Sequence, residues 1–177
     1  MEAERALPPL TPGTLYLVAT PIGNLEDITL RALRVLRECD VVAAEDTRRT
    51  GQLLKHFATS KPLGICQDRG LKVALVTDAG SPGISDPGER VVKAAIASGF
   101  RVESVPGACA LVAGLTASGL PTDEFHFIGF LPHKSGQRRN QLEALKAFAG
   151  TLVLYESPYR IEKLLNELNV VFPDRGL

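Results

Sequence analysis

The densest group of reactive side chains lies at residues 44–50, where the sequence reads Ala-Glu-Asp-Thr-Arg-Arg-Thr directly after a short apolar run. A carboxylate beside a bound hydroxyl can accept its proton, so Glu45 and Asp46 are candidate general bases. Acidic side chains are also favoured in the first turn of a helix, where they face the positive end of the helix dipole. The catalytic and the structural role both stay open at this stage.

The arginines of the same segment, Arg48 and Arg49, suit contacts to phosphate groups. A second basic group, which includes Lys134 and Arg138, lies in residues 133–139, although a solvated helix face is the commoner explanation for such charges. The whole chain has 20 basic and 20 acidic residues, so no overall positive field draws it to nucleic acid. Any nucleic-acid contact must therefore come from a local patch.

Three segments rich in glycine, proline and other small residues each follow an apolar run, at residues 19–24, 78–88 and 105–110. Such segments hold the backbone in place with little side-chain bulk, which suits close approach of a small polar ligand. The first lacks the G-x-G-x-x-G pattern, which argues against an ordinary dinucleotide-binding fold. The alternative interpretation is a set of turns, in which Asp86 only caps the next helix. Cys109 is interpreted as a small pocket-lining residue, since no histidine lies near it in sequence.

Three cysteines, Cys39, Cys66 and Cys109, are far apart and form no C-x-x-C pair, which favours neither a disulfide framework nor a zinc site. We therefore expect no metal and a reducing, cytoplasmic compartment. Residues 1–12 lack the apolar stretch of a signal peptide, and no later run is long enough for a membrane span. We accordingly expect no membrane partner.

Short apolar runs alternate with helix-like segments after residue 12, which predicts an α/β fold with a parallel sheet covered by helices on both faces. The predicted strands are residues 14–19, 41–44, 72–77 and 101–105, and the predicted helices include 29–38 and 48–57. The helix after Asp86 is the best marked, because Pro87 suits its first turn and Gly99 its end. Ligands bind at the carboxyl ends of parallel strands, so the loops after the strands should form the site.

The predicted organisation is a flexible tail at 1–12, an N-terminal α/β domain at 13–119 and part of a second α/β domain at 120–177. A boundary is indicated at Gly119-Leu120-Pro121. Beyond it we predict strands at 124–130 and 151–155 and helices at 135–149 and 158–168. Such a small unit would leave a strand edge exposed that a complete domain normally covers, so a fragment of a longer protein is one interpretation.

Six segments, taken in order, resemble the ribosomal RNA small subunit methyltransferase I family: residues 14–24, 44–49, 78–88, 106–107, 129–134 and 155–158. This family belongs to the tetrapyrrole-methylase-like superfamily, whose members hold S-adenosylmethionine between two α/β domains and commonly form homodimers. The resemblance implies 2′-O-methylation of a cytidine ribose in 16S rRNA, within the small ribosomal subunit. For such a substrate we assign Arg48, Arg49 and Lys134 to contacts with RNA phosphates.

The resemblance further assigns the cofactor contacts, to Ile22, Gly80, Ser81, Ile84, Cys109, Ala110 and Glu156. Ser81 stands where the wider superfamily usually has an acid. Two departures are visible, since the family normally continues past Leu177 and normally has a longer loop, bearing a His- and Glu-containing motif, between Phe57 and Lys72.

Three other functions stay open on the residues alone. The first is carbon methylation of a tetrapyrrole, which the basic residues disfavour. The second is a Mg²⁺-dependent phosphohydrolase, with Glu45, Asp46, Asp78 and Asp86 as metal ligands. The third is an inactive truncated fragment.

Overall fold

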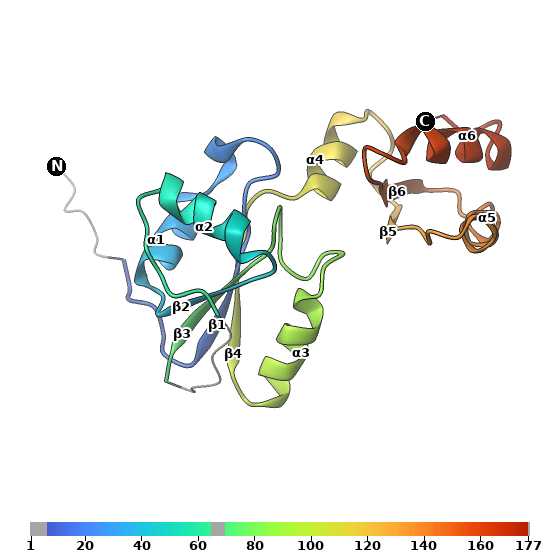
Figure 1. The fold of residues 1–177 in the computed structure, drawn as a ribbon. Helices are drawn as coiled ribbons and strands as arrows, with labels where there is room; N and C mark the ends of the chain where they lie inside the picture. The colour runs from blue at the N-terminus through green and yellow to red at the C-terminus, as the bar shows by residue number, and fades with distance from the viewer. Residues whose placement is uncertain (1–6, 65–69, 177) are drawn as a thin grey trace. The chain divides into compact units, whose positions relative to one another are not determined.

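The structure is a computed structural model that describes residues 7–64 and 70–176. It divides into two compact units, residues 1–110 and 111–177, which are described separately below (Figure 1). Cys66 lies outside the described residues. Among the described residues, no helix is long and apolar enough to cross a membrane.

The first unit is built on a four-stranded parallel sheet with the order β2-β3-β1-β4. The strands are β1 (Thr14–Val18), β2 (Val41–Ala44), β3 (Lys72–Val76) and β4 (Arg101–Val105). The helices are α1 (Leu30–Glu38), α2 (Thr47–His56) and α3 (Gly88–Ala97), with a short 3-10 turn, η1 (Leu25–Asp27), before α1. The α/β class is thus confirmed, and β1 and β3 each end one residue before their predicted ends.

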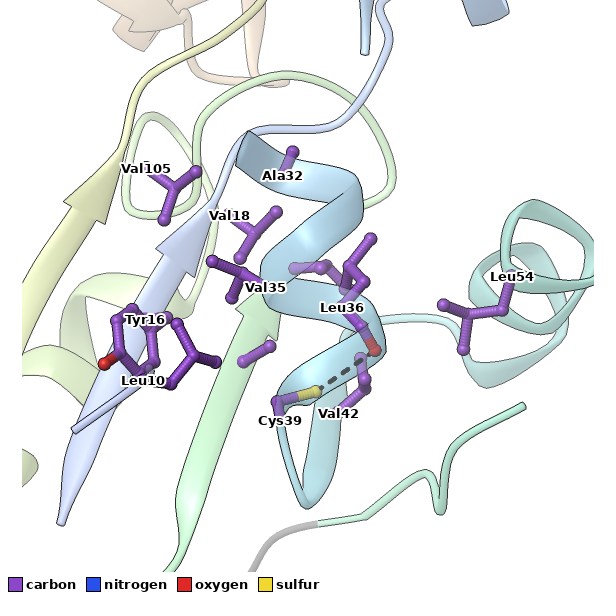
Figure 2. Packing of buried hydrophobic residues seen from close by; sticks show 12 residues of the cluster. Leu10, Tyr16, Val18, Ala32, Val35, Leu36, Cys39, Val42, Leu54 and Val105 are labelled. Carbon is purple, nitrogen blue, oxygen red and sulfur yellow. Dashed lines mark hydrogen bonds between the residues drawn. The ribbon is translucent and has the colours of Figure 1, made fainter. Parts of the chain in front are cut away.

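The first face of the sheet is covered by α1 and α2 (Figure 1). Ala32, Val35 and Leu36 recur at helical spacing, so one side of α1 is apolar, and all three are buried against the strands (Figure 2). Leu54 of α2 packs in the same cluster. Thr29 caps α1, because its hydroxyl accepts the N–H of Ala32 (3.0 Å).

The second face carries α3, on the opposite side of the sheet from α1 and α2 (Figure 1). Strand side chains alternate between the two faces, so Ala43, Val73 and Leu75 point to this side. Val91 and Ala95 of α3 are partly buried against them. Gly99 ends the helix with φ +78°, a conformation that glycine adopts without strain.

The second unit contains the two-stranded parallel sheet of β5 (Phe125–Phe130) and β6 (Thr151–Tyr155), with α4 (Ala110–Ala117), α5 (Ser135–Ala144) and α6 (Ile161–Val171). Its core joins α5 and α6 through side chains that include Leu142 and Leu164. The compact units divide at Ala110, one helix before the boundary predicted at Gly119. The N–H of Leu111 donates to Tyr155 Oη (2.9 Å), which ties α4 to β6.

Two helix predictions in this unit were wrong in extent. The helix predicted at 135–149 ends at Ala144, because Leu145 and Lys146 turn back with shorter-range hydrogen bonds, to the carbonyls of Leu142 and Glu143. The helix predicted from Pro158 begins at Ile161, because Ser157 holds a turn through its own carbonyl and hydroxyl.

Candidate cofactor and substrate site

The loops that follow β1 and β3 are joined to each other by backbone hydrogen bonds. Thr20 and Gly80 exchange both N–H···O bonds (2.9 and 3.0 Å), as residues of neighbouring strands do. The Thr20 hydroxyl also donates to the carbonyl of Thr77 (3.1 Å), at the end of β3. The first two glycine-rich loops therefore form one hydrogen-bonded structure at the carboxyl edge of the sheet.

Gly80 lies where these two loops meet the loop after β4. Its φ of +86° suits glycine, and a Cβ there would contact Ile22 Cγ2 (3.5 Å) and the carbonyl of Ala108 (3.7 Å). The hydroxyl of Ser81 donates to the same Ala108 carbonyl (3.3 Å), next to Cys109. Ile22, Gly80, Ser81 and Cys109, taken from three separate segments of sequence, are thus brought to one small area.

The loop after β4 also approaches β1 closely at Gly107. A Cβ added to this glycine would lie 2.9 Å from Ala19 Cβ, closer than side chains pack. Only glycine lets the third loop reach the first at this point. The following residue, Ala108, is the one whose carbonyl contacts Gly80 and Ser81, and Ala110 begins α4.

Asp86 clamps the second loop in its bent form. Its carboxylate accepts the N–H of Gly83 (2.8 Å) and the N–H of Gly88 (2.6 Å), so it satisfies the first turn of α3 as predicted while also fixing the loop. Ser85 between them has φ +61°, which is uncommon outside glycine. Ile84 is 41% exposed, which leaves an apolar side chain at the surface of this rigid loop.

The two candidate bases have different surroundings. Asp46 is the N-cap of α2, where it accepts the Arg48 N–H (2.8 Å) and pairs with the Arg48 guanidinium (3.3 Å). Hydrogen bonds from the Arg48 side chain and backbone lower the pKa of Asp46 below its ordinary value, which makes it a weaker base. The Glu45 carboxylate instead accepts a hydrogen bond from a neutral donor, the Thr77 hydroxyl (2.9 Å).

Arg49 and Arg48 are also placed differently. Arg49 pairs with Asp78 (3.3 Å), at the end of β3, and both line a cavity of about 400 Å³ at the carboxyl edge of the sheet. Thr20, Pro21 and Thr77 form other parts of its wall. Arg48 is 88% exposed beside Asp46 and does not line this cavity.

Two further residues of this cavity were missed in the sequence. Gln52 and His56 follow Arg49 at helical spacing and line the same wall as Arg49. The spacing of residues 49, 52 and 56 places them on one side of a helix, but the sequence does not show that this side of α2 faces the loops. One carboxylate atom at this cavity, Asp78 Oδ1, is buried without a hydrogen-bond partner among the described residues.

The remaining predicted residues lie in the second unit. Glu156 is held locally, since its carboxylate pairs with Arg160 (2.5 Å) and accepts the Ser157 N–H (2.7 Å). Lys134 is exposed at the start of α5.

Arg138, in contrast, is neither a phosphate contact nor part of a solvated face. It is buried, and its guanidinium binds both oxygens of Glu167 (2.5 and 2.6 Å) and the carbonyls of Pro132 and His133 (3.0 Å each).

Within residues 7–64 and 70–176, no cluster of three or more His, Cys, Asp or Glu side chains is arranged to hold a metal ion. Three of the acids considered as metal ligands are engaged elsewhere, Asp46 as a helix cap, Asp78 with Arg49 and Asp86 with two backbone N–H groups.

A family profile described as Tetrapyrrole (Corrin/Porphyrin) Methylases matches residues 14–67 and 65–176. The chain belongs to this family. Its relatives include proteins named Ribosomal RNA small subunit methyltransferase I, from Pseudomonas aeruginosa (48% identical over 92% of this chain) and Mesorhizobium japonicum (50% over 90%). The chain spans 63% and 59% of the length of these two relatives.

Two solved structures share the fold of this chain. One is uroporphyrin-III-C-methyltransferase from Thermus thermophilus, at a TM-score of 0.60 and 28% identity, covering 91% of this chain and 75% of that one. Another is diphthine synthase, at a TM-score of 0.65 and 18% identity, covering 87% of this chain and 71% of that one.

The alignments also contain a gap on this chain's side. The Pseudomonas aeruginosa alignment spans 178 positions but covers 92% of a 177-residue chain, so part of the relative has no counterpart here. The two family matches overlap at residues 65–67, inside the stretch between Phe57 and Lys72.

Proposed function

We propose that the chain is an S-adenosylmethionine-dependent methyltransferase whose substrate is small-subunit ribosomal RNA, methylated on the 2′-hydroxyl of a cytidine in 16S rRNA. The observation that carries this proposal is the high identity, over nine-tenths of the chain, to relatives named for that activity. Action on the assembled small ribosomal subunit, a homodimer and a cytoplasmic location belong to the same proposal.

The three hydrogen-bonded loops around Gly80 support the proposal that the cofactor is S-adenosylmethionine. Glycine conformations bring the Gly80 backbone close to Ile22 and Ala108, and the loops are fixed by their own hydrogen bonds before a ligand arrives. Ile22, Gly80, Ser81, Ile84, Cys109 and Ala110 would hold S-adenosylmethionine there, and the family resemblance adds Glu156 as a further contact. When bound, the cofactor supplies an electrophilic methyl group on a sulfonium sulfur.

Glu45 is the better of the two candidate bases. Methylation of the ribose 2′-hydroxyl would release the hydroxyl proton, and a carboxylate positioned by the Thr77 hydroxyl is suited to accept that proton. Asp46 is already engaged by Arg48 and has a lowered pKa, so we assign it to capping α2.

The cavity beside Arg49 is a suitable place for the target nucleotide, because its volume of about 400 Å³ falls in the range of small-ligand sites. Glu45 is not one of its lining residues, but Thr77, whose hydroxyl donates to the Glu45 carboxylate, lines it. Arg49, Gln52 and His56 would then contact it from α2. Arg48 and Lys134 are exposed and would contact phosphates outside the cavity.

Calorimetric titration with S-adenosylmethionine tests the cofactor site. We expect Ile84→Lys to weaken binding at least tenfold, because it places a cation beside the proposed site of a cationic cofactor. The matched control is Ile96→Lys, at an isoleucine of α3 that is 61% exposed. Equal binding by both variants would contradict the site, and binding only by a chain extended to the relatives' length would make this chain a partial module.

Transfer of labelled methyl groups to unmodified small subunits tests the base. Glu45→Gln should slow transfer by about 10²–10⁴ with cofactor binding unchanged. Asp46→Asn should have little effect, because asparagine also caps helices well. The reverse order of effects would overturn the assignment of Glu45.

RNA contacts are tested by the salt dependence of binding. Removing Arg48, Arg49 or Lys134 should weaken RNA binding and reduce the slope of log K against log salt by about one for each phosphate that is no longer neutralised. A slope that stays unchanged in all three variants would refute these contacts.

A further inference from the structure

The cavity at the carboxyl edge of the first unit's sheet offers hydrogen-bonding groups of several kinds. Its volume is about 400 Å³, and its polar lining consists of three threonines, Arg49, Gln52, His56 and Asp78. Hydroxyl, amide and imidazole groups can donate or accept a hydrogen bond, whereas a guanidinium only donates and an ionised carboxylate only accepts. Among the described residues that line this cavity, Asp78 is therefore the one whose side chain is limited to accepting.

The carboxylate of Asp78 has acceptor capacity that the protein itself does not use. Its Oδ2 pairs with Arg49 Nη1 at 3.3 Å, which is longer than the roughly 2.7–2.9 Å of a charge-assisted hydrogen bond. Its Oδ1 is buried and has no hydrogen-bond partner among the described residues. Buried polar atoms are nearly always paired, so an unpaired one calls for an explanation, such as a partner that arrives with a ligand. The side chain as a whole is 29% exposed and its last torsion is broad, so a donor in the cavity can reach the carboxylate.

Asp78 also has a fixed position next to the residues proposed for the reaction. The residue before it, Thr77, donates from its hydroxyl to the Glu45 carboxylate (2.9 Å), and its carbonyl accepts the Thr20 hydroxyl (3.1 Å). Two residues after it, Gly80 exchanges both backbone hydrogen bonds with Thr20. In the chain, Asp78 therefore lies between the residue that positions the proposed base and the proposed cofactor loop, on backbone that is held on both sides.

An acceptor at this place distinguishes the two pyrimidine bases of RNA. Cytosine carries an amino group at position 4, which donates hydrogen bonds, whereas uracil carries a carbonyl oxygen there, which accepts them. Carboxylates accordingly pair with the amino group of cytosine, while a carboxylate facing the uracil oxygen would oppose lone pairs to lone pairs. Gln52 and His56 could turn or change tautomer to suit either base, so they discriminate less.

We propose that Asp78 is a specificity-determining residue, which accepts a hydrogen bond from the amino group of the target cytosine and excludes a uridine at that position. The inference rests on the proposed function, because it takes the methylated nucleotide to lie in this cavity. It adds to that function the contact by which the base, and not only the ribose and its phosphate, is recognised.

The test compares binding of cytidine 5′-monophosphate and uridine 5′-monophosphate to the full chain. Binding is followed by the amide chemical shifts of residues 77–80 in NMR titrations, which report on the cavity itself and remain measurable for weak ligands. We expect a dissociation constant about tenfold or more lower for the cytidine nucleotide, since one well-placed base contact contributes discrimination of that order.

Three variants assign the preference to the carboxylate. Asp78→Asn should reduce the preference at least fivefold, because an amide can present either a donor or an acceptor. Asp78→Glu keeps a group that only accepts and should retain most of the preference. Asp40→Asn is the matched control and should leave it unchanged, because Asp40 pairs with Lys72 at the same 3.3 Å and is similarly exposed (33%) but lies before β2, at the amino ends of the strands.

Equal dissociation constants in the unchanged chain, a preference that survives Asp78→Asn, or equal losses in the Asn variants of Asp78 and Asp40 would overturn the proposal. A loss as large in Asp78→Glu as in Asp78→Asn would count against it as well, and so would the absence of saturable binding of both nucleotides.

Methyl transfer to small ribosomal subunits is measured separately, so the two proposals can fail independently. Transfer without any preference between the two nucleotides would refute the role of Asp78 alone. A preference that depends on Asp78, in a chain extended to the relatives' length that transfers no methyl group, would refute the methylation and leave a cytidine-binding site.

Discussion

The buried ion pair between Arg138 and Glu167 offers the sharpest test of how the second unit is held together. Arg138 has 5% of its side chain exposed, and its guanidinium hydrogen bonds join α5 to α6 and to the segment before α5. Replacing Glu167 by alanine would leave a buried cation without its counter-ion. That change, more than the loss of hydrogen bonds, sets the size of the effect.

Breaking a buried pair by removing one partner costs about 3–5 kcal/mol. The Glu167 carboxylate is 26% exposed, so water can partly solvate the site and the lower end, about 3 kcal/mol, is expected. Because about 1.4 kcal/mol changes an equilibrium tenfold, amides of α5 and α6 that exchange through opening of this unit should exchange roughly a hundredfold faster.

Hydrogen–deuterium exchange followed by mass spectrometry measures this locally, with α1 of the first unit as an internal reference. Glu143→Ala is the matched control, because Glu143 also pairs with basic residues but at the surface, with Arg139 of the same helix (4.0 Å) and with Lys146 just beyond it (2.7 Å). Such exposed pairs contribute at most about 1 kcal/mol. Equal acceleration in both variants would refute the structural role of the buried pair.

Three further predictions concern stability. Gly107→Ala should lower the free energy of unfolding of the first unit in urea by about 1–3 kcal/mol, because the new Cβ would lie 2.9 Å from Ala19 Cβ. Gly114→Ala is the control and should be neutral or stabilising, because nothing lies within 4 Å of its new Cβ. Equal effects of the two changes would contradict the close approach at Gly107. Asp86→Ala should speed amide exchange in residues 83–88 at least tenfold, since two N–H groups lose their acceptor, and unchanged exchange would count against the clamp. Hydrogen bonds from Arg138 lower the pKa of Glu167 below its ordinary 4.5. The contribution of Glu167 to stability is therefore complete above pH 4.5 and is lost as pH falls through the lower pKa of the folded state. Amide exchange of α5 measured against pH should show this loss of protection, and Glu167→Ala should abolish the pH dependence.

The local signals in the sequence predicted most of the first unit. Apolar runs bounded by polar residues located β2 and β4 at their observed ends, and Asp86 and Gly99 bounded α3 as expected, although the helix begins at Gly88, one residue after Pro87. Each of these features depends on neighbours within a few residues, so a single sequence contains them.

Features that depend on distant partners were not predictable in the same way. Arg138 and Lys134 look alike in a basic stretch, and only the packing of α5 against α6 shows that one is buried on Glu167. Asp46 shows that a local role can also stay open, because a carboxylate that caps a helix and one that acts as a base look alike in sequence.

The paired hydrogen bonds between Thr20 and Gly80 have a consequence for the energetics of ligand capture. Because they belong to the sheet edge, the two loops become ordered when the domain folds and not when a ligand arrives. A ligand held by them would lose little affinity to loop ordering, and its association rate would not wait for a conformational change. Binding to these loops should accordingly show a small heat-capacity change, limited to the apolar surface of the ligand and of residues such as Ile84.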